Sequence, residues 1–331
     1  MEARLMQPEQ FQQTFNRLEA EVQKVIVGHN DLIRKILIAF FAGGHVLLEG
    51  VPGLGKTLLV KALTHALGMS FKRIQFTPDL MPSDIVGTEV LTDTSGRREF
   101  QFKKGPIFAH VVLADEINRA TPKTQSAVLE AMEEKQVTVF GESHVLASPF
   151  IVLATQNPIE LEGTYPLPEA QLDRFMFNIV MTYLSEDEEV RVVTTTTGVD
   201  MVSPAQIFSG ADILDLQQLV RQVIVAEDVA RYAVRLVDAS RPGRQSDHQF
   251  IREWVKWGAG LRASQALILA GKARALILGR YHVSVSDIQA LARPVLRHRV
   301  IPNFYAESER ISADNLVERL LDAVPLPKSG M

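Results

Sequence analysis

The sequence contains no cysteine among its 331 residues. Disulfides, thiolate metal sites and cysteine nucleophiles are therefore excluded. A long apolar run is also missing, because the longest one, residues 36–48, is interrupted by Gly43-Gly44-His45. Such a run is too short to span a bilayer, and residues 1–18 are polar without an apolar signal core. These absences predict a cytoplasmic protein that does not insert into membranes.

A large excess of charge of one sign is missing as well. The net charge is −4 at pH 7, which argues against a surface built for nucleic acid. The eight histidines show no metal-ligand spacing, so no metal other than Mg²⁺ is expected. The hydrophobic fraction, by contrast, is 46%, which is enough for a large core and, at this length, for two domains.

The most informative motif is a glycine-rich loop between a short apolar strand, residues 45–49, and a helix expected over residues 58–67. In such a loop the backbone N–H groups surround the phosphates of a nucleoside triphosphate, and the helix N-terminus adds partial positive charge. Lys56 is expected to contact the β- and γ-phosphates, and Thr57 to ligate Mg²⁺. The predicted nucleotide-binding residues of this Walker A loop are Gly50, Pro52, Gly53, Leu54, Gly55, Lys56, Thr57 and Leu58.

Two acids follow a second apolar strand, residues 110–114, in the pattern called Walker B. Asp115 is expected to hold Mg²⁺, and Glu116 to orient and polarise the attacking water. The alternative is a pair of solvated acids at an exposed strand end, which the presence of the Walker A loop disfavours.

Three further polar residues are candidates for the same chemistry. Asn157 follows the strand at residues 150–155, where it could contact the γ-phosphate or the attacking water. Arg174 stands between a short helix and the last strand, so it could reach the γ-phosphate of a neighbouring subunit; a surface ion pair is the alternative. Arg262 lies near a helix start, where a cation opposes the helix dipole. That position suggests a phosphate contact across a domain cleft, with a plain surface position as the alternative.

Strand-like and helical segments alternate over the first half of the chain. Strands are expected at residues 45–49, 71–76, 110–114, 150–155 and 176–181. This alternation predicts an α/β fold with a parallel five-stranded sheet flanked by helices and with its ligand at the C-terminal ends of the strands. Two inserts interrupt the pattern, at about residues 81–105 and 137–147. The second is predicted to be a β-hairpin.

The second half of the chain has a helical pattern. Helices are expected over residues 213–223, 227–239, 262–278, 286–297 and 313–321, and a loop is expected over residues 194–204. We therefore expect an α/β nucleotide-binding domain at residues 1–184 and an all-α lid domain at residues 185–331. The basic cluster Arg293, Arg297 and Arg299 is expected on a solvated helix face, with a protein or nucleotide contact as the alternative. Arg119 is expected either in an ordinary salt bridge or at a subunit interface.

In their order along the chain these motifs resemble those of the AAA+ superfamily, and three of them resemble the MoxR family in particular. The three are residues 115–120 (DEINRA), 154–158 (ATQNP) and 167–175 (LPEAQLDRF). The resemblance runs from about residue 19 to about residue 322. It implies that residues 81–105 are the helix-2 insert and residues 137–147 the hairpin before the first sensor.

The resemblance also implies roles for single residues. Asn157 would be sensor 1, Arg174 the arginine finger and Arg262 sensor 2, while Val27 and Gly28 would line the adenine pocket. The chain departs from the family at two places. His29 stands where glutamine is frequent, and Gly260-Leu261 where Ser-Pro is frequent, so the adenine contacts and the aim of Arg262 stay open.

The function implied by the resemblance is an ATPase that hydrolyses ATP to ADP and phosphate with Mg²⁺ in a ring, expected to be a hexamer. Asn157 and Arg262 would sense the γ-phosphate of their own subunit, and Arg174 would act on the neighbour. The output would be chaperone-like remodelling, maturation or metal insertion in client protein complexes, with a partner bearing a von Willebrand factor A domain.

Other function classes stay open at this point. One is a magnesium-chelatase-like ATPase subunit, and another is a nucleotide-gated scaffold. A nucleic-acid motor would need basic hairpin tips, whereas Phe140-Gly141-Glu142-Ser143 carries an acid and no Lys or Arg. A small-molecule kinase ranks last, because it needs neither a lid arginine nor an arginine that acts in trans.

Overall fold

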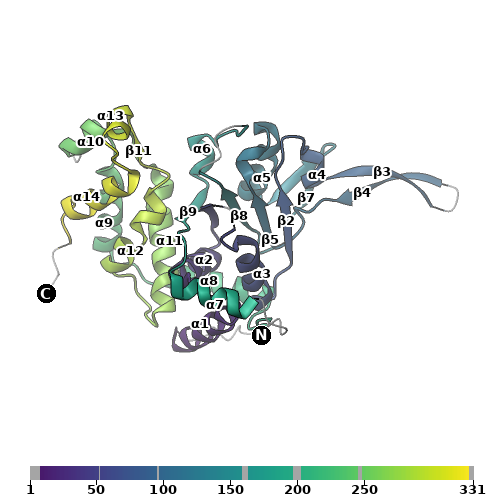
Figure 1. Cartoon of the computed structure of the whole chain (residues 1–331), viewed down its shortest axis with the longest axis horizontal. Helices are drawn as coiled ribbons and strands as arrows, with labels where there is room; N and C mark the ends of the chain where they lie inside the picture. The colour runs from purple at the N-terminus through teal and green to yellow at the C-terminus, as the bar shows by residue number, and fades with distance from the viewer. Residues whose placement is uncertain are drawn as a thin grey trace.

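Five parallel strands form the sheet at the centre of the N-terminal half of the chain (Figure 1). The computed structural model describes residues 8–51, 53–94, 97–158, 163–196, 203–244 and 248–327. In spatial order the strands are β2 (Phe71–Gln75), β5 (Val111–Asp115), β8 (Ile151–Gln156), β1 (His45–Glu49) and β9 (Phe175–Val180). The predicted α/β fold with a parallel five-stranded sheet is confirmed.

Both faces of this sheet are covered, as its apolar strands require. Val46 and Leu48 of β1 belong to the hydrophobic cluster that includes α2 and α3, whereas Leu47 packs in a second cluster with Val128 of α5. Successive side chains of a strand point to opposite faces, so one apolar strand serves both cores. The helices of this half are α1 (Pro8–Gln23), α2 (Asn30–Ala42), α3 (Lys56–Ala66), α4 (Pro82–Val86), the 3-10 turn η1 (Ile117–Arg119), α5 (Pro122–Glu134), α6 (Glu169–Leu172) and α7 (Glu186–Thr196).

Helix α7 corrects one prediction, because residues 194–196 are helical rather than part of a loop. The run of β-branched threonines there disfavours a helix on propensity. However, the hydroxyls of Thr194 and Thr195 donate to main-chain carbonyls three or four residues earlier, at Val190 and Arg191. Each hydroxyl therefore has its hydrogen-bond acceptor within the helix. Residues 197–202 of the expected loop lie outside the described residues.

The two inserts are antiparallel hairpins. The first, β3 (Gly87–Thr94) and β4 (Arg97–Lys104), follows α4 and extends away from the body of the molecule (Figure 1). The second, β6 (Gln136–Val139) and β7 (Glu142–Val145), follows the end of α5 directly. Phe100 on the first hairpin and Phe140 at the tip of the second are largely exposed.

The C-terminal part is helical, as predicted, with one addition. A two-stranded antiparallel pair, β10 (Val255–Trp257) and β11 (Ile301–Pro302), joins the segment after α10 to the segment before α13. Its helices are α8 (Gly210–Gln222), α9 (Glu227–Asp238), α10 (Gln249–Trp254), α11 (Leu261–Ile277), α12 (Val285–Leu296), α13 (Phe304–Ser308) and α14 (Ala313–Ala323). One hydrophobic cluster runs from α2 into α11, so the domain boundary at residue 184 stays a prediction. Within the described ranges, no helix is both long and apolar enough to cross a bilayer.

The segment after α12 covers the edge strand β9, and this corrects the expectation of a solvated basic face. Arg299 is 5% exposed and donates to the carbonyl of Phe175 at 2.7 Å and to Asp173 Oδ1 at 2.7 Å. His298 Nε2 lies 3.0 Å from the same carbonyl, and Arg297 Nη1 donates to the carbonyl of Asn178 at 3.1 Å. An uncovered edge strand would leave these carbonyls unpaired. Arg297, His298 and Arg299 therefore form a structural seam between lid and sheet, whereas Arg293 is half exposed and pairs with Glu318.

Candidate nucleotide-binding site

Three neighbouring strands end at one cavity, and the predicted site residues stand at these ends. Gly50 follows β1, Asp115 ends β5 and Asn157 follows β8, and the order β5-β8-β1 places them side by side. Because the strands are parallel, their C-terminal ends share one edge of the sheet. The cavity there measures about 480 Å³. Its lining is Gly53, Leu54, Gly55, Lys56, Thr57, Leu58, Arg73, Asp115, Glu116, Thr155 and Asn157.

The Walker A loop has the geometry of a phosphate-binding loop. Gly53 and Gly55 have φ of 87° and 72°, and a Cβ on either would meet no atom within 4 Å. The backbone conformation, rather than packing, therefore requires glycine. Helix α3 begins at Lys56, so the positive end of its dipole lies at the cavity. The predicted loop residue Pro52 lies outside the described residues.

Lys56 is held within the loop. Its ammonium donates to the carbonyl of Gly50. Burial lowers its pKa, while the carboxylates of Asp115 and Glu116 act in the opposite direction. A half-buried cation beside two acids and a ring of N–H groups is suited to a polyanionic ligand.

The Walker B acids are fixed by neighbouring strands. Asp115 Oδ1 accepts from the Thr155 hydroxyl at 2.7 Å, and Oδ2 accepts from Arg73 Nε at 2.8 Å. Glu116 has a left-handed φ of 57°, and its N–H donates to Thr155 Oγ1 at 2.8 Å. Its Oε2 accepts from Gln75 Nε2 at 3.0 Å. Arg119 Nε lies 3.2 Å from the same oxygen, so Arg119 takes part in an ion pair within the chain.

These residues fit Mg²⁺. The hydroxyl of Thr57 and the carboxylate of Asp115 line the same cavity and supply hard oxygen donors. Each oxygen of Asp115 has two lone pairs, so contacts with Thr155 and Arg73 leave it capacity for a further ligand. Across the part of the chain that the structure describes, no group of three or more His, Cys, Asp or Glu could hold a metal ion. A site with so few protein ligands suits Mg²⁺ that arrives with the phosphates of its nucleotide.

Sequence reasoning did not identify Arg73, Gln75 and Thr155 as site residues. They belong to β2 and β8, which flank β5, and Gln75 is paired in register with Asp115. Alternation along β2 places Arg73 and Gln75 on one face, which was the available signal. What the sequence lacked was the strand order that brings this face to the Walker B acids.

A second cavity, of about 300 Å³, lies on the other side of the Walker A loop. Val27 and His29 line it together with Leu54 and Leu58, and α7 closes it with Val192 and Val193. Gly28 stands at φ 70°, and a Cβ there would lie 2.7 Å from Leu184. Such a cavity is apolar and of the size that a nucleobase requires.

His29 brings a polar atom to this apolar cavity. Its Nε2 is buried and has no hydrogen-bond partner among the described residues. Burial lowers the pKa of His29, while Glu188 acts in the opposite direction. A buried ring nitrogen without a protein partner is available to a base edge.

Arg174 and Arg262 lie together, but at the N-terminal ends of the strands, opposite the C-terminal ends that carry the Walker A loop. Arg174 immediately precedes β9, whose first residue pairs with His45 at the start of β1. Arg262 lies in the first turn of α11, and both arginines line one cavity with His45. Strands of five and six residues, about 17–20 Å long, separate this edge from the Walker A loop.

The arrangement contradicts the expected position of Arg262. Its guanidinium lies 2.6 Å from Glu133, at the end of α5, rather than at the phosphate loop of its own chain. The physical reason is the seam along β9, which fixes the start of α11 beside the N-terminal ends of the strands. Arg262 therefore shares its location with Arg174.

Comparison with known proteins identifies the family. The chain is 44% identical over 315 residues to the protein named Chaperone MoxR1 of Mycobacterium tuberculosis, a match that covers 95% of this chain and 83% of the relative. The chain belongs to the MoxR family of AAA+ ATPases. Protein MoxR of Methylorubrum extorquens is 30% identical over 328 residues, which is 94% of either chain.

Domain and structure comparisons agree with this membership. Residues 45–177 match the ATPase family associated with various cellular activities (AAA), and residues 251–320 match the AAA lid domain. The crystal structure of a proposed ATPase from Cytophaga hutchinsonii is 40% identical, with a TM-score of 0.91 over 97% of either chain. In this MoxR-family chain the Walker A, Walker B and Asn157 candidates fall within the AAA match, and Arg262 falls within the lid match.

Proposed function

We propose that this MoxR-family protein hydrolyses ATP to ADP and phosphate at an active site completed by a second copy of the chain. The observation that carries the proposal is that the site residues are divided between the C-terminal and the N-terminal ends of the strands of one sheet. Lys56, Asp115, Glu116 and Asn157 line a cavity at one edge, and Arg174 stands at the other. A single chain cannot bring the two sets to one phosphate.

At the nucleotide-binding edge each residue has a distinct role. Lys56 and the loop N–H groups bind the phosphates, and Val27, Gly28 and the α7 side chains enclose the base. Mg²⁺ held by Thr57 and Asp115 would neutralise phosphate charge when bound. Glu116 orients the water that attacks the γ-phosphorus and accepts its proton as the bond to ADP breaks. Asn157 donates to the γ-phosphate or to that water.

The opposite edge supplies the arginines to the neighbour. Arg174 stabilises the charge on the γ-phosphate of the next subunit, a role worth about 10³–10⁵ in rate for arginines of this kind. We assign Arg262 to the same neighbour rather than to the phosphates of its own chain, because it lines one cavity with Arg174. A contact between two different faces of identical chains repeats around an axis and forms a ring where the rotation closes. We propose that it closes as a hexamer.

The output of the ring is proposed from the family. The relative named a chaperone supports chaperone-like remodelling of client complexes. Maturation or metal insertion in those complexes, and a von Willebrand factor A domain partner in the cytoplasm, are proposed from the family resemblance alone. The two hairpins, with exposed Phe100 and Phe140, are the proposed contacts to the client. Exposed aromatics on projecting hairpins are suited to binding other proteins.

A mixing experiment tests the divided site. Arg174→Ala and Glu116→Gln proteins are each expected to bind ATP and to lose turnover. Mixed together, they should regain activity, because an intact Glu116 site then faces an intact Arg174. Absence of any gain on mixing, with mixed rings present by light scattering, would remove the trans role. ATP binding without turnover in the wild type would instead favour the nucleotide-gated scaffold.

A further inference from the structure

Glu133, at the C-terminal end of α5, contacts both arginines at once. Its Oε2 lies 2.7 Å from Arg174 Nη2, and its Oε1 lies 2.6 Å from Arg262 Nη2. Arg174 also donates through Nη1 to the carbonyl of Leu129, 2.6 Å away on the same helix. One carboxylate therefore spans a guanidinium from the core and a guanidinium from the lid.

This arrangement offsets a repulsion. Arg174 and Arg262 carry the same charge and approach the two oxygens of a single side chain, so without the carboxylate they would repel each other. With it, the group of three keeps a net charge of +1. Both arginines remain partly exposed, at 30% and 46%, and face the surface where the neighbour's phosphates are proposed to lie.

Glu133 also joins side chains from core and lid, beside the Arg299 bonds to Asp173 and Phe175 that hold the two parts together. Arg174 is fixed by α5 and β9 of the core, whereas Arg262 stands on the first turn of α11 in the lid. A rotation of the lid relative to the core would separate the two guanidinium groups unless a common partner held them. A carboxylate that accepts one N–H from each provides that partner.

We propose that Glu133 is a positioning residue that holds Arg174 and Arg262 together as one unit, so that both reach the γ-phosphate of the neighbouring subunit. The proposal rests on the trans role of the arginines described above. It assigns to Glu133 an effect on turnover in the neighbour and none on nucleotide binding in its own subunit.

The test uses mixed rings in which only one kind of interface is active. Arg174→Ala subunits accept arginines, and Glu116→Gln subunits donate them. The donor is then made with a second change, Glu133→Gln, which removes the charge but keeps the size. Glu134→Gln is the matched control, because Glu134 is the next residue, is exposed and, in the described part of the chain, forms no ion pair with either arginine.

The Glu133→Gln donor is expected to lower the rescued kcat about fivefold, the scale of a partly exposed ion pair, with the KM for ATP unchanged. The Glu134→Gln donor should match the Glu116→Gln donor. The same Glu133→Gln change in the Arg174→Ala acceptor should leave the rescued kcat unchanged. Glu133→Asp, which keeps the charge at shorter reach, should recover part of the loss and serves where the Gln variant does not fold.

The other outcomes overturn the proposal in distinguishable ways. Equal rescue by Glu133→Gln and Glu134→Gln donors removes the role of Glu133 while leaving the trans arginines in place. A faster rate with Glu133→Gln would mean that Glu133 withholds the arginines rather than positions them. If even the unmodified Glu116→Gln donor gives no rescue, the trans site fails and the role of Glu133 falls with it.

Discussion

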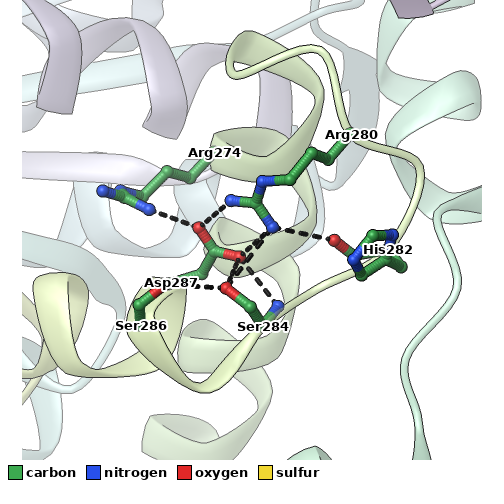
Figure 2. Close-up of polar contacts among 6 residues, drawn as sticks. All are labelled: Arg274, Arg280, His282, Ser284, Ser286 and Asp287. Carbon is green, nitrogen blue, oxygen red and sulfur yellow. Dashed lines mark hydrogen bonds and ion pairs between the residues drawn. The ribbon is translucent and has the colours of Figure 1, made fainter.

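Asp115 and Asp287 both lie beside arginine side chains, and they differ in what surrounds their oxygens. Asp287, in the lid, is fully buried and accepts from Arg274, Arg280 and both the N–H and the hydroxyl of Ser284 (Figure 2). Asp115 is 13% exposed, accepts from Thr155 and Arg73, and opens onto a cavity of about 480 Å³. The first carboxylate is saturated by the protein, and the second retains capacity for a ligand.

The contrast separates structural from functional charge. Burial by itself would raise the pKa of Asp287, but the bonds from Arg280, Ser284 and Arg274 outweigh it and hold that pKa below its usual value. The network joins the end of α11 to the N-terminus of α12, and the carboxylate at its centre is fully buried (Figure 2). The carboxylate of Asp115, by contrast, lines the nucleotide cavity and can still accept a ligand from that side. Substitutions should therefore affect activity at one place and stability at the other.

The largest effect is expected from Glu116→Gln, which removes the base that orients water. We expect kcat to fall about 10³-fold, equivalent to about 4 kcal/mol, because general-base catalysis contributes on this scale. Nucleotide affinity and thermal stability should change little. Steady-state kinetics with calorimetry of ATP binding measures both, and unchanged kcat would show that Glu116 is only a solvated acid.

The reverse result is expected for Asp287→Asn. Breaking a buried ion pair should cost about 3 kcal/mol of unfolding free energy, since Arg274 and Arg280 are left without their counter-ion. ATP affinity should be unchanged. Urea unfolding measures the loss, and Asp322→Asn, an exposed change on α14, is the control. If Asp287→Asn protein stays folded but loses ATP affinity, Asp287 would not be a purely structural charge.

Lys56→Ala should weaken ATP binding by at least about 100-fold, or about 2.7 kcal/mol, because a charge-assisted contact to the phosphates is lost. Lys61→Ala, on the exposed side of the same helix, should bind normally. Calorimetry decides between them, and normal affinity for Lys56→Ala would remove the phosphate-loop assignment.

A smaller effect concerns pH. Burial lowers the pKa of His45 to about 4, opposed by the carbonyl of Met132 and assisted by Lys135. Its Nδ1 accepts from the N–H of Val152 at 3.0 Å, so a proton there would face another donor. The folded-state pKa is below the unfolded value, so stability is lost as pH falls from about 6.5 toward 4. At pH 5 the loss is about 2 kcal/mol.

Denaturant unfolding from pH 7 to pH 4.5 measures this loss. His45→Gln should show a flatter pH profile than the wild type, whereas the exposed His65→Gln should keep the slope. Identical slopes for all three proteins would show that His45 does not carry the acid sensitivity.

The smallest effect is expected at Arg73. Its guanidinium contacts Asp115 Oδ2, so it would compete with a bound cation for the charge of that carboxylate, and its side chain is 45% exposed. Arg73→Gln should lower the Mg²⁺ concentration for half-maximal nucleotide binding about threefold, with less than about 1 kcal/mol change in stability. Lys72→Gln, the neighbouring exposed residue, is the control. A raised Mg²⁺ requirement would show that Arg73 supports the site instead.

Much of the fold and site followed from the sequence, because the signals are local. Apolar strands followed by Gly50, Asp115 and Asn157 predict one ligand-binding end of the sheet, and the parallel sheet brings Asp115, Asn157 and the Walker A loop after Gly50 to one cavity. The second hairpin, β6 and β7, also followed from a local turn signal, whereas the hairpin in the first insert was not predicted.

What could not be predicted depends on contacts between distant segments. Arg73 contacts Asp115 only because β2 lies beside β5, and the residue pattern of either strand alone does not predict that they are neighbours. Arg299 carries a charge that predicts solvent, yet it is buried against β9, where main-chain carbonyls need donors. Arg262 follows this seam to the far edge of the sheet. A charged residue type predicts a position on the surface. Only contacts between segments distant in the sequence show that such a residue is buried.

The most direct test of the divided site is the rate of ATP hydrolysis per subunit against protein concentration, with light scattering on the same samples. The account predicts a specific rate that rises as rings form, and Glu116→Gln protein that assembles without hydrolysing. Full turnover by a monomer would contradict it, because no chain can place its own Arg174 at its own phosphates.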